Sequence, residues 1–200
     1  MTDTYSNLLD DLAARIPDAV AIRDRDQIVN YRDLAASSRR LAQGLAASGI
    51  GFGDCVAFWL PNIAAYMALH FACARLGAIT VSVNTRFRAS EVGDIIGRAG
   101  CKALILWPTF KDIPFLDILT EVDAAALAEL QTVILYDEGE ARPDLPTALT
   151  GKTLLSCAEL DTHPELATNF GSEDDGVIIF TTSGTTAAPK FVLHSQRSIV

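Results

Sequence analysis

The chain has 200 residues, of which 50% are hydrophobic, and a formal net charge of −9 at pH 7. This length is sufficient for one substantial core or two small ones, so a globular α/β protein is expected. The acidic balance argues against a nucleic-acid partner, because binding to a phosphate backbone requires a basic face. An anionic nucleotide would have to be held by a few local groups.

The sequence also indicates where in the cell the protein is expected. The chain opens on polar residues followed by Asp10 and Asp11, unlike the basic and then apolar pattern of a secretory signal. The longest apolar stretch, residues 68–83, is interrupted by His70 and Arg75, which does not suit a membrane span. We therefore expect a soluble, cytoplasmic protein without a transmembrane segment.

The cysteines are widely spaced, without C-x-x-C spacing or clustered histidines. Metal binding and disulfide formation are therefore not expected. We expect reduced and buried thiols at Cys55, Cys73, Cys101 and Cys157.

In chain order, apolar residues at helical spacing predict an amphipathic helix over residues 4–16, capped by Thr4 or Asp3. A short hairpin is expected over residues 19–29. Asn30 is expected to cap the next helix, with Gly49 at its end. Strands and helices then alternate, with strands near 55–60, 78–83, 103–107 and 132–136 and helices near 63–77, 90–99 and within 111–130.

Apolar runs separated by helices predict a parallel sheet with crossover helices. We expect a doubly wound, mostly parallel α/β fold in which residues 1–136 form the scaffold. Residues 137–176 are expected to be a polar excursion. Residues 177–200 carry a hairpin and the start of another helix, which indicates an N-terminal portion of a longer protein.

The stretch inside this last hairpin is rich in hydroxyl side chains and reads Thr181-Thr182-Ser183-Gly184-Thr185-Thr186-Ala187-Ala188-Pro189-Lys190. Turn amides, hydroxyls and a lysine ammonium are the donors that phosphate oxygens need. A Walker A loop is not indicated, because Pro189 and Phe191 flank Lys190 where that loop needs Gly and Ser or Thr. The alternative is a turn that its own hydroxyls stabilise.

Ser-Gly-Thr-Thr-x-x-Pro-Lys after an apolar strand resembles the phosphate loop of the AMP-forming adenylate ligases, which include acyl- and aryl-CoA synthetases, peptide-synthetase adenylation domains and luciferases. Ala187 stands where that family usually has a second glycine; at positive φ it would cost about 1 kcal/mol. Upstream stretches look like the family's N-terminal scaffold in the same order: Asn30–Leu34, Gly49–Asp54, Val56–Asn62, Leu76–Ala78 and Val83–Asn84.

The resemblance implies an ATP-dependent ligase that joins a small-molecule carboxylic acid to coenzyme A through an acyl-adenylate, with ATP, Mg²⁺ and coenzyme A as cofactors. It implies that the loop binds ATP or pyrophosphate through Thr182, Ser183, Gly184, Thr185, Thr186 and Lys190. The family's catalytic lysine, metal-binding glutamate and acyl pocket lie downstream, so no catalytic or metal-binding residue is located here. These 200 residues are expected to be inactive without the C-terminal part of the enzyme. A homo-oligomer of the enzyme is a further expectation.

Three further residues are candidates. His194 and Gln196 lie where many relatives carry His-Ser-His, and either could contact substrate or phosphate or pack below the loop. Arg86 is a candidate contact for a coenzyme A phosphate, with a surface charge as the alternative. An adenylation domain with another acceptor and a non-catalytic α/β module with a vestigial loop remain open as alternatives.

Overall fold

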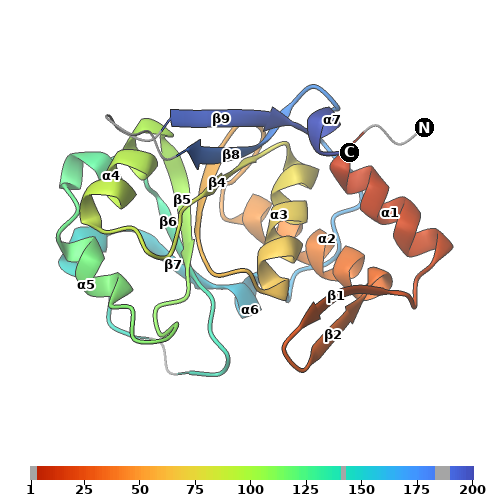
Figure 1. The fold of residues 1–200 in the computed structure, drawn as a ribbon, viewed down its shortest axis with the longest axis horizontal. Helices are drawn as coiled ribbons and strands as arrows, with labels where there is room; N and C mark the ends of the chain where they lie inside the picture. Colours follow the sequence, from red (N-terminus) through yellow and green to blue (C-terminus); the bar gives the residue numbers. More distant parts are fainter. Residues whose placement is uncertain (1–3, 141–142, 183–189) are drawn as a thin grey trace.

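The computed structural model describes residues 4–140, 143–182 and 190–200. Seven strands in this range form one sheet in the order β7-β6-β5-β3-β4-β8-β9 (Figure 1). The strands are β3 (Cys55–Trp59), β4 (Ile79–Ser82), β5 (Cys101–Leu106), β6 (Thr132–Leu135), β7 (Thr153–Ser156), β8 (Gly176–Thr182) and β9 (Lys190–Ser195). Neighbouring strands run parallel except β8 and β9, which are antiparallel. The predicted doubly wound, mostly parallel fold is confirmed.

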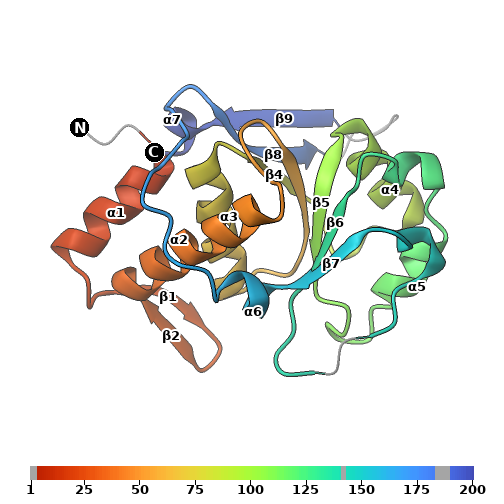
Figure 2. The same ribbon diagram turned by 180° about the vertical axis from the view of Figure 1, so that it is seen from behind.

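Helices cover both faces of this sheet (Figures 1 and 2). Alternate residues of β3 point to opposite faces, so Val56 and Phe58 join one core while Ala57 and Trp59 join the other. On the first face lie α1 (Tyr5–Arg15), α2 (Tyr31–Ala47) and α3 (Ala64–Leu76); on the second lie α4 (Ala89–Arg98) and α5 (Phe115–Thr120).

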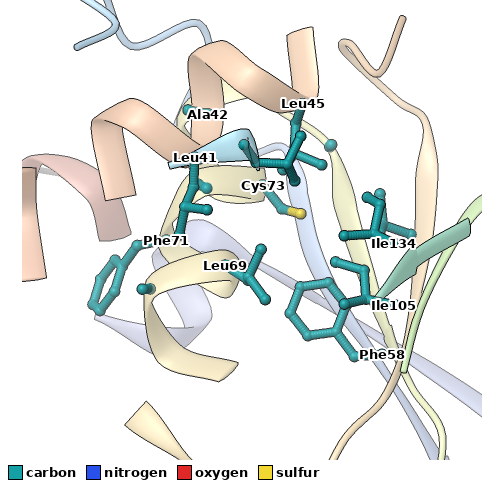
Figure 3. Packing of buried hydrophobic residues seen from close by; sticks show 14 of the residues in the cluster. Leu41, Ala42, Leu45, Phe58, Leu69, Phe71, Cys73, Ile105 and Ile134 are labelled. Atoms are coloured by element: carbon teal, nitrogen blue, oxygen red, sulfur yellow. The ribbon is translucent and has the colours of Figure 1, made fainter. Parts of the chain in front are cut away.

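Figure 3 shows how the first core is built. Leu41 and Leu45 of α2 face α3, and Leu69 of α3 faces Phe58 and Ile105 of the sheet. Each of these side chains is buried. The helix α3 therefore lies between α2 and the sheet, which explains why it is apolar around most of its circumference.

Local signals fix the ends of the early elements. The hydroxyl of Thr4 accepts a hydrogen bond from Asn7 N at 3.2 Å, and the Asn30 side chain accepts one from Asp33 N at 2.8 Å. Both expected caps are confirmed. Between these helices lies the predicted hairpin of β1 (Val20–Asp24) and β2 (Gln27–Asn30), which pair antiparallel.

The segment predicted as a polar excursion contributes to the sheet. Strand β7 pairs in parallel with β6, and the short helix α6 (Cys157–Leu160) follows it. Strand β7 was not predicted, because an edge strand with one partner needs few apolar residues and its two leucines are only half-buried. The remaining short elements are α7 (Gln196–Ile199) and the 3-10 turns η1 (Ala124–Leu127) and η2 (Thr147–Leu149).

A buried arginine joins four segments beside the first core. The Arg75 guanidinium is 1% exposed and donates to both carboxylate oxygens of Asp10, at 2.7 and 2.8 Å. It also donates to Ser38 Oγ at 3.0 Å and to Asn169 Oδ1 at 2.8 Å. Burial alone would raise the pKa of Asp10, but the hydrogen bonds and charge of Arg75 outweigh it and lower that pKa. This cluster ties α1, α2 and α3 to the segment that leads to β8.

Removing the carboxylate of this cluster should destabilise the protein strongly. Asp10→Asn leaves the buried Arg75 charge without its counter-ion, so we expect the free energy of unfolding in urea to fall by about 3 kcal/mol. The matched control is Asp11→Asn, which removes an exposed pair with Arg15 and should cost less than about 1 kcal/mol. Equal losses in the two variants would contradict this account.

The structure also predicts a pH dependence of stability from His70, which is buried with its Nδ1 2.9 Å from Thr80 Oγ1. Burial lowers its pKa from 6.5 to about 4. Between these values the unfolded chain binds a proton that the folded chain does not, so stability present above pH 6.5 is lost as the pH falls to 4. The contribution is about 3 kcal/mol.

His70→Asn should therefore flatten the decline in the free energy of unfolding between pH 6.5 and 4. The measurement is a series of urea denaturations across this range, with His163→Asn as the control for removing a histidine elsewhere. A decline as steep as in the parent protein would show that His70 does not carry this dependence.

Candidate functional site

A cavity of about 860 Å³ opens at the carboxyl ends of the parallel strands. Its lining comes from the residues that follow β3, β4 and β5 and from the last residues of β8. The chain passes from β3 to β4 on one side and to β5 on the other side, so the strand order reverses here. Open parallel sheets bind ligands in the crevice at such a point. The main lining residues are Leu60–Asn62, Tyr66, Ser82–Phe87, Phe110–Lys111 and Phe180–Thr182.

The predicted phosphate loop connects two strands at this edge. Thr182 lines the cavity as the last residue of β8, and it pairs with Lys190, the first residue of β9. Both residues are exposed. The other predicted binding residues, Ser183, Gly184, Thr185 and Thr186, lie outside the described residues, as does Ala187. The structure thus brings the two ends of the loop together, with Thr182 on the cavity wall.

Arg86 is presented to the same cavity by a fixed turn. The buried Trp59 donates its indole N–H to the carbonyl of Asn84 at 3.1 Å. The Asn84 side chain in turn accepts a hydrogen bond from Arg86 N at 2.9 Å. The second core thereby holds the turn that carries the exposed Arg86 side chain.

A second cation of the cavity was not predicted from the sequence. Lys111 follows β5, and its ammonium lies 5.1 Å from the centre of the Phe110 ring. Its φ is +55°, a conformation that residues other than glycine adopt rarely. Its place in the segment that follows an expected strand was the available signal, because the carboxyl ends of parallel strands meet at one edge of the sheet.

His194 lies behind the cavity wall. It pairs with Ile178 across the β8–β9 hairpin and is half-buried. Its ring packs edge-to-face on Phe180, with 5.6 Å between the ring centres, and Phe180 lines the cavity. Its contact with the cavity therefore runs through Phe180.

Gln196 is fully buried, and its side chain links three parts of the chain. Its Oε1 accepts a hydrogen bond from Tyr5 N at 3.0 Å, and its Nε2 donates to the carbonyl of Ala74 at 3.2 Å. A Cβ at Gly171 would lie 2.2 Å from this Nε2, so glycine is required there. Of the two predicted alternatives, this geometry supports packing below the loop.

In the ranges that the structure describes, no group of three His, Cys, Asp or Glu side chains is placed to hold a metal ion. Burial raises the pKa of the Cys73 thiol to about 12, which makes it a poor metal ligand and nucleophile. None of the helices in these ranges combines the length and the apolar character needed to cross a lipid bilayer.

Comparison with known proteins identifies the family. The sequence profile described as AMP-binding enzyme matches residues 9–200. The chain belongs to the AMP-binding enzyme family. The predicted resemblance to the adenylate-forming ligases is thereby confirmed.

Similar proteins agree with this assignment. The mitochondrial medium-chain acyl-CoA ligase ACSF2 of Rattus norvegicus is 32% identical over 214 residues, which cover 98% of this chain and 34% of the relative. The inhibitor-bound N-terminal domain of FACL13 from Mycobacterium tuberculosis matches with a TM-score of 0.72 at 29% identity, covering 96% of this chain and 44% of that one. The anthranilate CoA ligase AuaEII, in complex with anthranoyl-AMP, shares the fold with a TM-score of 0.77 at 22% identity. The match covers 94% of this chain and 34% of AuaEII. The chain spans about a third of the length of the curated relatives that it matches.

The hydrogen bonds of Gln196 give a prediction that distinguishes a structural role below the loop from a substrate contact. Gln196→Ala should lower the free energy of unfolding by about 1–3 kcal/mol, because it removes the acceptor of the half-buried Tyr5 N and leaves the Ala74 carbonyl with Gly77 N as its donor. Urea denaturation provides the measurement, and Gln27→Ala on β2 controls for loss of an exposed glutamine. Unchanged stability combined with weaker substrate binding would instead make Gln196 a substrate contact.

Proposed function

We propose that this chain forms the N-terminal part of an AMP-forming ligase that joins a carboxylic acid to coenzyme A. The observation that carries the proposal is that the Ser-Gly-Thr-Thr-x-x-Pro-Lys sequence directly follows Thr182, where β8 ends on the cavity wall, in a chain of the AMP-binding enzyme family. The similarity to ACSF2 of Rattus norvegicus, a medium-chain acyl-CoA ligase, supports this class of reaction.

In the proposed first step, a carboxylate oxygen of the acid attacks the α-phosphorus of ATP. The bond between that phosphorus and the bridging oxygen breaks, and pyrophosphate leaves with the electron pair. In the second step, the thiol of coenzyme A attacks the acyl carbon, loses its proton and displaces AMP. Neither step needs an oxidant or a reductant.

The loop is proposed to stabilise the charge that develops on pyrophosphate. Thr182 and Lys190 flank the loop, and we assign the triphosphate to these two residues together with Ser183, Gly184, Thr185 and Thr186. Fixed donors aimed at a leaving group lower the barrier by electrostatics, without covalent chemistry by the protein. Arg86 is proposed to contact a coenzyme A phosphate, since it is an exposed cation on the cavity wall.

In the ranges that the structure describes, no group of three His, Cys, Asp or Glu side chains could hold a metal ion, so we assign no Mg²⁺ ligand to this chain. We likewise assign no catalytic residue to this chain. Because the chain spans only about a third of its relatives, we expect these 200 residues alone to release no pyrophosphate.

The test is pyrophosphate release by the full-length protein that carries this chain, with MgATP and a panel of fatty and aromatic acids, with and without coenzyme A. We expect release that depends on the acid, and consumption of free thiol when coenzyme A is present. Release without thiol consumption would mean another acceptor. No release from the folded protein across the panel would overturn the proposal in favour of a non-catalytic module.

Lys190→Ala should lower kcat/KM for MgATP about 10- to 100-fold, the loss expected for a charge-assisted hydrogen bond to phosphate. The matched control is Lys152→Ala. Lys152 donates to the carbonyl of Leu127 at 3.0 Å and precedes β7, at the opposite edge of the sheet from the cavity. Equal effects of the two substitutions would contradict the assignment of Lys190.

A further inference from the structure

The hairpin that carries the phosphate loop extends beyond the rest of the sheet. Strand β8 pairs with β4 only at Thr80↔Ile178 and Val81↔Ile179, whereas its pairing with β9 continues to Thr182↔Lys190. Within the described residues, the last part of β8 therefore has β9 as its one strand neighbour. A two-stranded ribbon is only marginally stable by itself. The end of this hairpin needs another contact to hold the loop in place.

Helix α4 supplies such a contact through its last residue. The guanidinium carbon of Arg98 lies 4.2 Å from the centre of the Phe191 ring. Phe191 directly follows Lys190 and pairs with Thr181 of the protruding segment. Figure 1 shows α4 beside the beginning of β9. A cation at this distance over an aromatic ring is attracted by the negative face of the ring.

The arginine is itself oriented on its helix. Arg98 Nη1 donates to Asp94 Oδ2 at 3.0 Å, one helical turn earlier. Phe191 is half-buried against the second core, on the face of the sheet that α4 covers. The ring is thus held between the core and the guanidinium, and Phe191 connects the backbone next to Lys190 to α4.

We propose that Arg98 is a positioning residue for the phosphate loop and acts through Phe191. By stacking on this ring, Arg98 ties the protruding end of the hairpin to α4 and limits the freedom of Lys190 before ATP binds. A group ordered in advance loses less entropy on binding, so the contact strengthens the affinity for the triphosphate. The inference rests on the proposed function, because it assigns to Lys190 a phosphate contact.

The experiment uses the full-length protein and compares KM for MgATP, KM for the acid and the free energy of unfolding. Arg98→Met keeps most of the apolar stem but removes the charge, and should raise KM for MgATP about 2- to 5-fold, as expected for an exposed cation–π contact. KM for the acid should not change. Arg98→Lys retains a cation and should recover part of the loss.

The matched control is Arg15→Met. Arg15 is the last residue of α1 and pairs with Asp11 one turn earlier at 3.3 Å, so it reproduces the position and the ion pair of Arg98 at a site remote from the hairpin. This control should leave KM for MgATP unchanged. An equal rise in both variants would overturn the proposal, because it would show a general effect of losing a terminal arginine.

A double-mutant cycle tests whether the effect runs through the ring. Phe191→Leu should raise KM for MgATP by a similar factor, and the double variant should be no worse than either single variant. Multiplicative effects, or a large loss with Arg98→Met and none with Phe191→Leu, would overturn the proposal, the second by indicating a direct phosphate contact. If Lys190→Ala itself leaves MgATP kinetics unchanged, the proposed function fails. If Lys190→Ala has its effect and Arg98→Met has none, the positioning inference alone fails.

Discussion

The central strands of this protein must be buried on both faces, and most of its architecture follows from that constraint. Val56 and Phe58 of β3 require cover on one face, while Ala57 and Trp59 require it on the other. Helices that cross from strand to strand provide this cover, and such crossovers make the strands parallel. Parallel strands end at a common edge, so the polar residues that follow each strand meet there. The cavity is therefore a consequence of how the core is covered.

The hairpin of β8 and β9 follows this pattern only in part: Val177, Ile178 and Ile179 of β8 are buried, but contacts of a different chemical kind also hold the hairpin. Where β9 ends, the hairpin is held by the buried amide of Gln196, which bonds to the backbone of α1 and α3. Next to the phosphate loop, it meets α4 through Arg98 and Phe191. The segment before β8 is held by Arg75 through Asn169. Polar contacts at its periphery thus add to the apolar burial of β8 and support an element in which Val192 and Leu193 of β9 are exposed.

The fold was largely predictable because its signals are local. The alternation of apolar strands with amphipathic helices predicted the parallel sheet, and the caps at Thr4 and Asn30 predicted where two helices begin. Strand β7 was missed because an edge strand needs little apolar sequence. For the site, the order of residues in the loop was sufficient to indicate the family. The positions of Gln196 and Arg98 depend on contacts between residues far apart in sequence, and no local pattern encodes them.

The pairing of β4 with β8 has a consequence for how the chain is made. The partner of Thr80 is Ile178, 98 residues later, so the ribosome must add nearly half of the chain before this side of β4 is covered. At ordinary rates of synthesis this interval lasts roughly 5–20 s. During this interval, a nascent chain in which β3, β4 and β5 have already paired exposes the edge of β4 that β8 later covers. An exposed strand edge favours pairing with other chains. Translation speed and chaperone occupancy over residues 83–176 therefore bear directly on the yield of correctly folded protein.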